Sequence, residues 1–415
     1  MKIRRTISIL LALTIAALCA FTGCTKNRAS EDAETIDSEN ESVTDEIQLL
    51  NYGMSSPTVY RSCEAVNGVS VVNDTDGLSL INESTGKKTQ FYESTAVRDL
   101  LFNGKSVIFS DQIINDDVKV TNPSDYYGDQ WYVCYVDEYD LESKSSHTLF
   151  TSNGIDPGLI YFDSSCLYYT DVADKNVGDY KAVESITPSL FKFDFESGEK
   201  TVISEHACSA ESCGSFIFYN ALESYPNQSD DYVNPGPIHI YDTKTGKDVK
   251  VDDYGELLYS ENDRFYFIHI INKNDTITGG EVKSCKSDGS DVKTVIKIDG
   301  RIARGLNHYV TVALGTWADD DTKEKVINTK TGKDFIIPSL DCYYLDNQLI
   351  ASSEKADDPK IYRYNDSGKK ELYVDLSSYN GVDESADLIS KTENGIYVCG
   401  YVDGQYVIKF IKSDN

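Results

Sequence analysis

Tight turns that end in glycine recur along this chain at a nearly constant interval, and this repeat constrains the fold more than any other feature. A short run of alternating apolar residues precedes each turn and another follows it. The clear copies are Ser84-Thr85-Gly86, Glu196-Ser197-Gly198, Lys244-Thr245-Gly246, Lys330-Thr331-Gly332 and Asp366-Ser367-Gly368, with weaker ones at Ser143-Lys144-Ser145 and Asp288-Gly289-Ser290. Glycine suits a turn position that needs a positive φ. Gly86 and Gly368 are 282 residues and six intervals apart, so the mean period is 47 residues.

A second hairpin precedes each of these turns, built on a two-residue turn between two strand-like runs. Its copies are Asn67-Gly68, Asn103-Gly104, Asn262-Asp263, Asp346-Asn347 and Asn394-Gly395. Each unit therefore has four antiparallel strands. Four-stranded units at this spacing are typical of a β-propeller, so we predict a single all-β propeller domain over residues 47–415.

The repeat predicts eight blades, or seven if the first or sixth unit is misread. The last unit, Asp387 to Asn415, has three strands before the sequence ends. An open edge favours aggregation, and the apolar run Ile47-Gln48-Leu49-Leu50 could supply the missing strand and close the ring. An irregular pair of β-sandwiches is the alternative, but it does not explain the 47-residue period.

Composition agrees with an all-β fold and excludes one class of partner. The chain has 29 Tyr and 15 Phe but only two Trp and two Met, which favours strands over packed helices. Its formal net charge of −29 would repel phosphates, so DNA and RNA are poor candidate partners.

The first 24 residues have the pattern of an export signal. Lys2, Arg4 and Arg5 precede the apolar run from Ile7 to Ala20, which is shorter than a membrane span. The ending Phe21-Thr22-Gly23-Cys24 resembles the lipobox of bacterial lipoproteins. That resemblance implies cleavage of residues 1–23, lipidation of Cys24 and anchoring at the outer face of the bacterial cytoplasmic membrane. The alternative is an ordinary secretory signal that is cut nearby.

Residues 24–46 predict a disordered tether between the lipid and the folded domain. Residues 25–46 include eight acids and almost no large apolar side chain before Val43, so they cannot bury enough surface to fold. As a coil, such a segment spans roughly 25–30 Å.

Two strand motifs resemble known propeller families. Leu167-Tyr168-Tyr169-Thr170-Asp171 is similar to the strand motif of YWTD propellers, and Lys286 to Lys293 is similar to the Asp-Gly-Ser hairpin of TolB-type propellers. Most of the chain also resembles Tyr-rich propeller lipoproteins of Gram-positive bacteria. These motifs describe strand geometry, so the resemblance implies the fold and no activity.

Eight cysteines follow Cys24, and most of them predict buried thiols. Six lie in apolar, strand-like runs: Cys63, Cys134, Cys166, Cys285, Cys342 and Cys399. Cys208 and Cys213 are close enough in sequence to be a disulfide candidate in an exported protein. Together with His206 they suggest zinc only weakly, because the fourth ligand is missing.

Long loops between the second and third strands of several units predict a recognition face. We expect these insertions at Gln112 to Gln130, Val172 to Pro188, Tyr225 to Pro237, Asn272 to Gly280 and around Trp317. They mix acids with aromatics, which suit an extracytoplasmic protein or a glycan. The candidate ligand-binding residues are Tyr126, Tyr127, Asp129, Trp131, Asp179, Tyr180, Asp230, Asp231, Tyr232, Trp317, Asp319, Asp320 and Asp321. The alternative is that insertions and acids simply accumulate in surface loops.

No cofactor or metal site is predicted. Asn73-Asp74-Thr75-Asp76-Gly77 resembles a calcium loop only loosely, because Val72 stands where an oxygen ligand is required. Calcium at Asp319-Asp320-Asp321 is a weaker alternative to a solvated acidic loop.

The sequence does not favour an enzyme. It contains no Gly-x-Ser-x-Gly, His-Glu-x-x-His or Gly-x4-Gly-Lys-Ser/Thr motif, and His239 and His269 fall within strand-like runs. The remaining catalytic alternative is a glycosidase or lyase that uses paired carboxylates near the central channel. We therefore expect a non-catalytic, lipid-anchored propeller at the cell surface.

Overall fold

The computed structural model describes residues 66–412, apart from several internal gaps. The gaps are residues 75–76, 95, 124–127, 155, 174–176, 181–186, 222–235, 262, 274–275, 301, 307, 315–322, 339–341, 346–347, 353–359, 366, 379–386, 392–394 and 403–404. Residues 1–65, with the predicted signal, Cys24, the tether and Ile47–Leu50, lie outside the described part. Within that part, no helix is long and apolar enough to cross a membrane.

The described residues form antiparallel sheets whose strands follow one another in chain order. The first three sheets contain β1 (Val69–Asp74), β2 (Gly77–Asn82) and β3 (Lys87–Glu93); β4 (Val97–Phe102), β5 (Ser106–Ile114), β6 (Tyr132–Asp140) and β7 (Ser145–Thr151); and β8 (Gly158–Phe162), β9 (Cys166–Asp171), β10 (Ser189–Asp194) and β11 (Lys200–Ser204). A seven-stranded sheet follows, made of β12 (Ser209–Cys213), β13 (Phe216–Asn220), β14 (Gly236–Asp242), β15 (Asp248–Glu261), β16 (Arg264–Lys273), β17 (Thr276–Lys286) and β18 (Lys293–Asp299).

Three further sheets complete the described chain. They contain β19 (Ile302–Leu306), β20 (Tyr309–Ala313), β21 (Lys323–Asn328) and β22 (Asp334–Pro338); β23 (Cys342–Leu345), β24 (Gln348–Ser352), β25 (Lys360–Tyr364) and β26 (Lys370–Asp375); and β27 (Asp387–Lys391), β28 (Gly395–Val402) and β29 (Gln405–Lys412). The described residues also include the 3-10 turn η1 (Leu376–Ser378).

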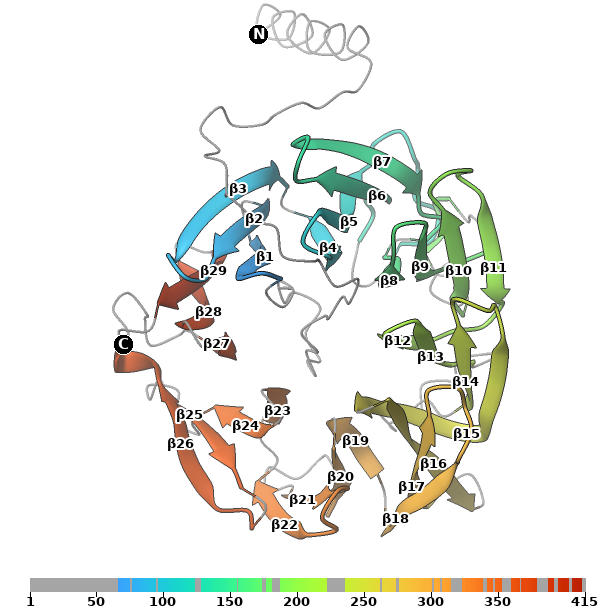
Figure 1. The fold of residues 1–415 in the computed structure, drawn as a ribbon, viewed down its shortest axis with the longest axis vertical. Coiled ribbons are helices and arrows are strands. Elements are labelled where there is room, and N and C mark those ends of the chain that lie inside the picture. The colour runs from blue at the N-terminus through green and yellow to red at the C-terminus, as the bar shows by residue number, and fades with distance from the viewer. Residues whose placement is uncertain are drawn as a thin grey trace, which may run out of the picture.

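The sheets stand radially around a common axis, so the protein is a β-propeller (Figure 1). The first strands of the sheets, such as β4, β8 and β12, lie nearest the axis, and β7 and β11 lie at the rim. The core lies between neighbouring sheets: Leu101 and Ile108 of the second sheet pack with Leu167 and Phe191 of the third. The all-β propeller predicted from the repeat is confirmed.

Strand β15 connects two parts of the seven-stranded sheet. Its first half pairs with β14, its second half pairs with β16, and both pairings meet at Gly255, which faces Gly236 and His269. A Cβ on Gly255 would lie 2.6 Å from the carbonyl oxygen of Ile268, so only glycine lets β16 approach this closely.

The recurring turns have the backbone that the sequence predicts. Gly86, Gly198, Gly246, Gly332 and Gly368 all have φ between 69° and 75°. In the weaker copies Gly289 has φ 80°, while Lys144 takes the left-handed conformation with φ 55°. Each turn is local: the Gly86 N–H donates to the carbonyl of Asn82 at 2.8 Å, and the Asn82 side chain accepts from the Thr85 N–H at 3.0 Å.

The predicted long loop at Asn272 to Gly280 is wrong. Residues 272–280 were expected to form an insertion, but β16 and β17 continue as a ladder that pairs Ile271 with Gly279 and Lys273 with Thr276. The run of apolar and β-branched residues on both sides favours strand, so the two strands continue through the expected insertion.

The predicted disulfide between Cys208 and Cys213 is also wrong. Strand β12 separates the two residues, and five extended residues span about 16 Å, far more than a disulfide allows. The Cys208 thiol instead donates to the carbonyl of Asn220 at 3.6 Å. Cys134, Cys166 and Cys285 are buried free thiols, as predicted.

The first and last sheets contact each other through one buried carboxylate. Glu83, at the end of β2, accepts hydrogen bonds from the Ser70 hydroxyl at 2.7 Å and from the Tyr397 hydroxyl of β28 at 3.1 Å. Each of these two sheets has three strands within the described residues. The Glu83–Tyr397 contact therefore joins the two ends of the ring.

Candidate functional site

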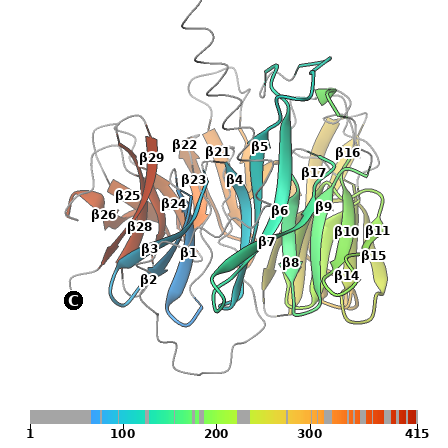
Figure 2. The same ribbon diagram turned by 90° about the horizontal axis from the view of Figure 1, so that it is seen from above.

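Two connections between second and third strands, from β5 to β6 and from β9 to β10, lie on the same side of the ring. Figure 2 shows the described parts of the connection from β5 to β6, residues 115–123 and 128–131, rising above the strands on this side. The corresponding connection from β9 to β10 covers residues 172–188. Both belong to the predicted long loops, and much of the other long loops, 222–235 and 315–322, lies outside the described residues.

Backbone hydrogen bonds lock these two connections together. The Thr121 N–H donates to the carbonyl of Gly178 at 2.7 Å, and the Tyr180 N–H donates to the carbonyl of Asn122 at 3.1 Å. The Asn122 side chain also donates to the Asp179 carboxylate at 2.8 Å. We call the described residues 115–123, 128–131 and 177–180 the crest, because they form one unit that projects from two neighbouring sheets.

The crest has an apolar core of its own. The rings of Trp131 and Tyr180 pack with centroids 4.7 Å apart, and Val172 completes the cluster. The Tyr180 hydroxyl donates to the carbonyl of Gln130 at 2.5 Å and accepts from the N–H of Tyr132 at 3.1 Å. The hydroxyl therefore closes the base of the crest, where the polypeptide returns to β6.

This core corrects two of the predicted ligand-binding residues. Trp131 is 3% exposed and Tyr180 is 0% exposed, so neither ring faces solvent. Sequence alone could not show this, because the residues that bury each ring lie about 50 positions away in the other loop. Both aromatics stabilise the crest.

Gly178 allows the two loops to approach each other. Its φ is +85°, and a Cβ there would lie 2.7 Å from the carbonyl oxygen of Lys119. Any other residue would be strained in its backbone and would also collide with the opposing loop.

The outer surface of the crest is acidic. Asp116, Asp117 and Asp129 are exposed, and Asp179 is half-buried beside Asn122. The structure thus brings Asp129, Trp131, Asp179 and Tyr180 together in one place. The other predicted ligand-binding residues lie outside the described residues: Tyr126, Tyr127, Asp230, Asp231, Tyr232, Trp317, Asp319, Asp320 and Asp321.

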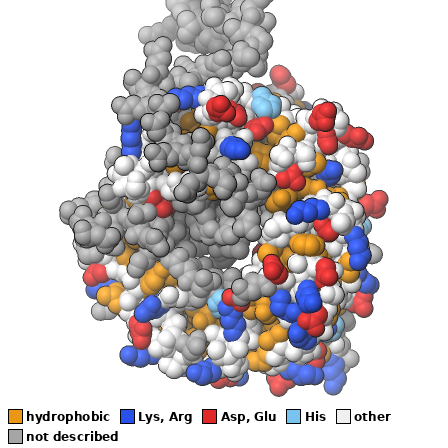
Figure 3. Space-filling model, viewed as in Figure 1, with side chains coloured by type: hydrophobic (Ala, Val, Ile, Leu, Met, Phe, Trp, Pro, Cys, Tyr) orange, Lys and Arg blue, Asp and Glu red, His pale blue; other side chains and the backbone are white. Residues whose placement is uncertain are grey.

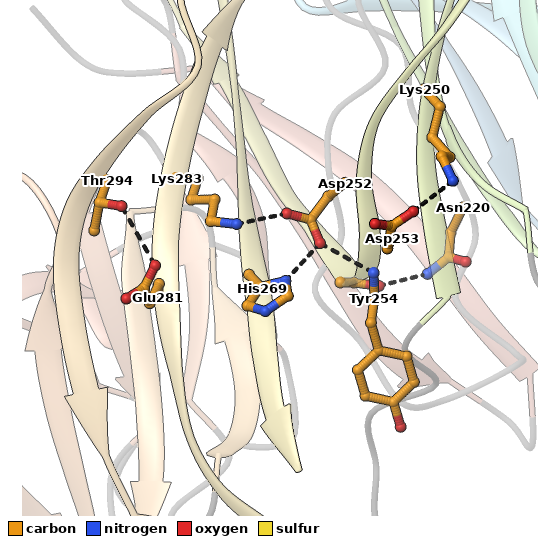
Figure 4. A network of polar contacts seen from close by, with 10 residues as sticks. Asn220, Lys250, Asp252, Asp253, Tyr254, His269, Glu281, Lys283 and Thr294 are labelled. Atoms are coloured by element: carbon orange, nitrogen blue, oxygen red, sulfur yellow. Dashed lines mark hydrogen bonds and ion pairs between the residues drawn. The ribbon is translucent and has the colours of Figure 1, made fainter.

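A polar network at the crossing of β15 was not predicted (Figure 4). The Asp252 carboxylate accepts from His269 Nδ1 of β16 at 2.6 Å and from Lys283 Nζ of β17 at 2.7 Å, and also from the N–H of Tyr254 at 3.0 Å. Burial works to raise the pKa of Asp252, but these donors outweigh it and hold the pKa below its usual value. The network ties β15 to β16 and β17.

The YWTD-like run places another buried carboxylate at a connection between sheets. Asp171, its last residue, accepts hydrogen bonds from the Ser152 hydroxyl and from the N–H groups of Asn153, Gly154 and Val172, at 2.8–2.9 Å. Burial nevertheless raises the pKa of Asp171. All of these donors belong to the protein itself, which points to a structural role.

Two glutamates lie on strands close to the ring axis. Glu211 is on β12. Glu256 is on the second half of β15, which pairs with β16 and is followed in the sheet by β17 and β18. Burial raises the pKa of Glu211 to about 7 and that of Glu256 to about 8. The buried Oε2 atom of Glu256 has no hydrogen-bond partner among the described residues.

Charged side chains of both signs are interspersed over the face seen in Figure 3. Among the residues that the structure describes, no group of three or more His, Cys, Asp or Glu lies close enough to hold a metal ion.

The fold is similar to known propellers, whereas the sequence matches no family model and no curated protein. A prolyl endopeptidase aligns with TM-score 0.45 and 10% identity over 89% of this chain, which spans 55% of the length of that enzyme. The β-propeller domain of the Trilobed protease from Pyrococcus furiosus aligns with TM-score 0.41 and 14% identity, over 79% of this chain and 95% of that domain. TolB from Acinetobacter baumannii aligns with TM-score 0.32 and 10% identity, over 65% of this chain and 63% of its own.

Proposed function

We propose that this protein is a non-catalytic, lipid-anchored cell-surface β-propeller that binds an extracytoplasmic protein or a glycan through the loops on one face. The observation that supports this is the crest. Two neighbouring connections form a projection with its own buried core, away from the contacts that close the ring. A preformed projection loses little conformational entropy when it binds a partner, which is how binding loops on rigid scaffolds work.

We infer eight blades from the strand order. The seven-stranded sheet divides at Gly255 into two groups that share β15, which makes eight groups in all. The first and last groups each have three strands among the described residues. In the first group, the bridge between Val66 and Val69 lies where an inner strand would end. In the last group, the described residues contain no fourth strand beside β29. Seven blades would require one of these groups to be part of another.

Anchoring is inferred from the first 46 residues. The lipobox-like ending at Cys24 and the acidic tether that follows would hold the ring outside the membrane. The test is Cys24→Ser: we expect the variant to lose its lipid mass and to leave the membrane fraction. A variant that still carries the lipid would contradict the assignment.

The binding function is tested by crosslinking in cells. Replacing residues 116–130 with a short turn removes the β5–β6 loop of the crest and leaves β5, Trp131 and β6 in the sequence. We expect a specific partner captured by the native protein to be lost from this variant. The control is Glu196→Gln, which changes an exposed side chain in the turn between β10 and β11. An unchanged partner, with the variant folded, would contradict the proposal.

A carboxylate-based glycosidase or lyase acting on wall or extracellular polysaccharide is the second candidate. The observation in its favour is that Glu211 and Glu256 have a raised pKa close to neutrality, as a general acid requires. Release of sugar fragments by the native protein, abolished by Glu211→Gln or Glu256→Gln, would establish the enzyme and overturn the non-catalytic proposal.

A further inference from the structure

We draw no further inference here: the strongest candidate, the pair of glutamates Glu211 and Glu256 on strands close to the ring axis, belongs to the site already described, and beyond the second candidate function it offers only the raised pKa of two carboxyl groups.

Discussion

Asp252 shows how a single side chain can connect three strands. It is 8% exposed, and its partners His269 and Lys283 come from two different strands of the neighbouring group. A buried carboxylate is costly unless donors satisfy it, and here three donors do. The network is therefore a stabilising contact at the place where β15 passes between two groups of strands.

We predict that Asp252→Asn lowers the free energy of unfolding by about 2–3 kcal/mol at pH 7, because it removes charge-assisted hydrogen bonds from a buried site. The pKa of Asp252 is lowered in the folded state, so its contribution is present above the unfolded pKa and is lost as pH falls through the folded pKa. The difference between the variant and the native protein should shrink below about pH 3.9. Urea titrations across pH measure it.

The control for Asp252 is its neighbour Asp253. Asp253 forms an ion pair with Lys250, but its side chain is 81% exposed. Asp253→Asn should change the free energy of unfolding by less than about 1 kcal/mol. Equal effects of the two substitutions would show that the network adds nothing beyond a surface charge.

Glu256 predicts the opposite pH dependence. Burial raises its folded pKa to about 8, so the unfolded chain ionises first as pH rises from about 4.5. The native protein should lose stability over this range, and Glu256→Gln should not. We expect the variant to gain at least about 1 kcal/mol relative to the native protein between pH 5 and pH 8. The control is Glu142→Gln, which changes an exposed carboxylate. If the stability of Glu256→Gln and of the native protein changed with pH in the same way, the raised pKa of Glu256 would be refuted.

At the scale of elements, β15 depends on a close approach between two backbones. Gly255 faces the carbonyl of Ile268, and a backbone oxygen cannot rotate away as a side chain can. Strand register on both sides of this residue would have to shift to accommodate a Cβ.

We therefore predict that Gly255→Ala lowers the free energy of unfolding by about 1–3 kcal/mol, measured from denaturant midpoints. Gly158→Ala is the matched control, because its new Cβ would lie at the same 2.6 Å from the Thr170 Oγ1 atom, which belongs to a side chain that can move. The Gly158 variant should lose clearly less. If both variants lose the same free energy of unfolding, the close approach of β15 and β16 at Gly255 does not constrain the fold.

At the scale of the whole molecule, the ring is joined where its two ends meet. Glu83 and Tyr397 are 314 positions apart and share a buried hydrogen bond. Burial, and then the nearby Glu83 charge, raise the pKa of Tyr397, so its hydroxyl stays protonated and donates.

We expect Tyr397→Phe to cost about 1–3 kcal/mol, because the buried Glu83 carboxylate loses a donor. In a double-mutant cycle with Glu83→Gln, the coupling energy should be at least about 0.5 kcal/mol. The matched pair is Lys250 and Asp253, an exposed contact between neighbours on one strand. Additive effects of Tyr397→Phe and Glu83→Gln would show that the junction is not coupled.

Closure of the ring also predicts a role for residues 47–50. If this apolar run pairs with the edge of β29, a chain that starts at residue 52 should melt several degrees below one that starts at residue 44, since an unpaired edge is left exposed. Melting followed by circular dichroism measures the difference. Equal melting temperatures of the two chains would show that residues 47–50 do not protect the edge of β29.

The strands, the turns and the propeller fold follow from the sequence alone. Turn geometry depends on contacts within four residues, so Gly86, Gly198 and Gly246 could be assigned directly, and even the exception at Lys144 lies at the expected place. The repeat then implied a fold in which such hairpins stack around an axis. Turn type and strand alternation depend on residues that are close together in the sequence, so they can be predicted from the order of the residues.

Which side chains are buried, and what they touch, became clear only in the folded protein. Trp131 looked like a ligand contact, yet Tyr180 covers it from a loop 49 positions away. The sequence around Asp252 did not predict its network, because the partners come from other strands. The predicted disulfide between Cys208 and Cys213 was wrong because β12 is extended. Burial and pairing of this kind depend on distances across the fold, which separation along the chain does not specify.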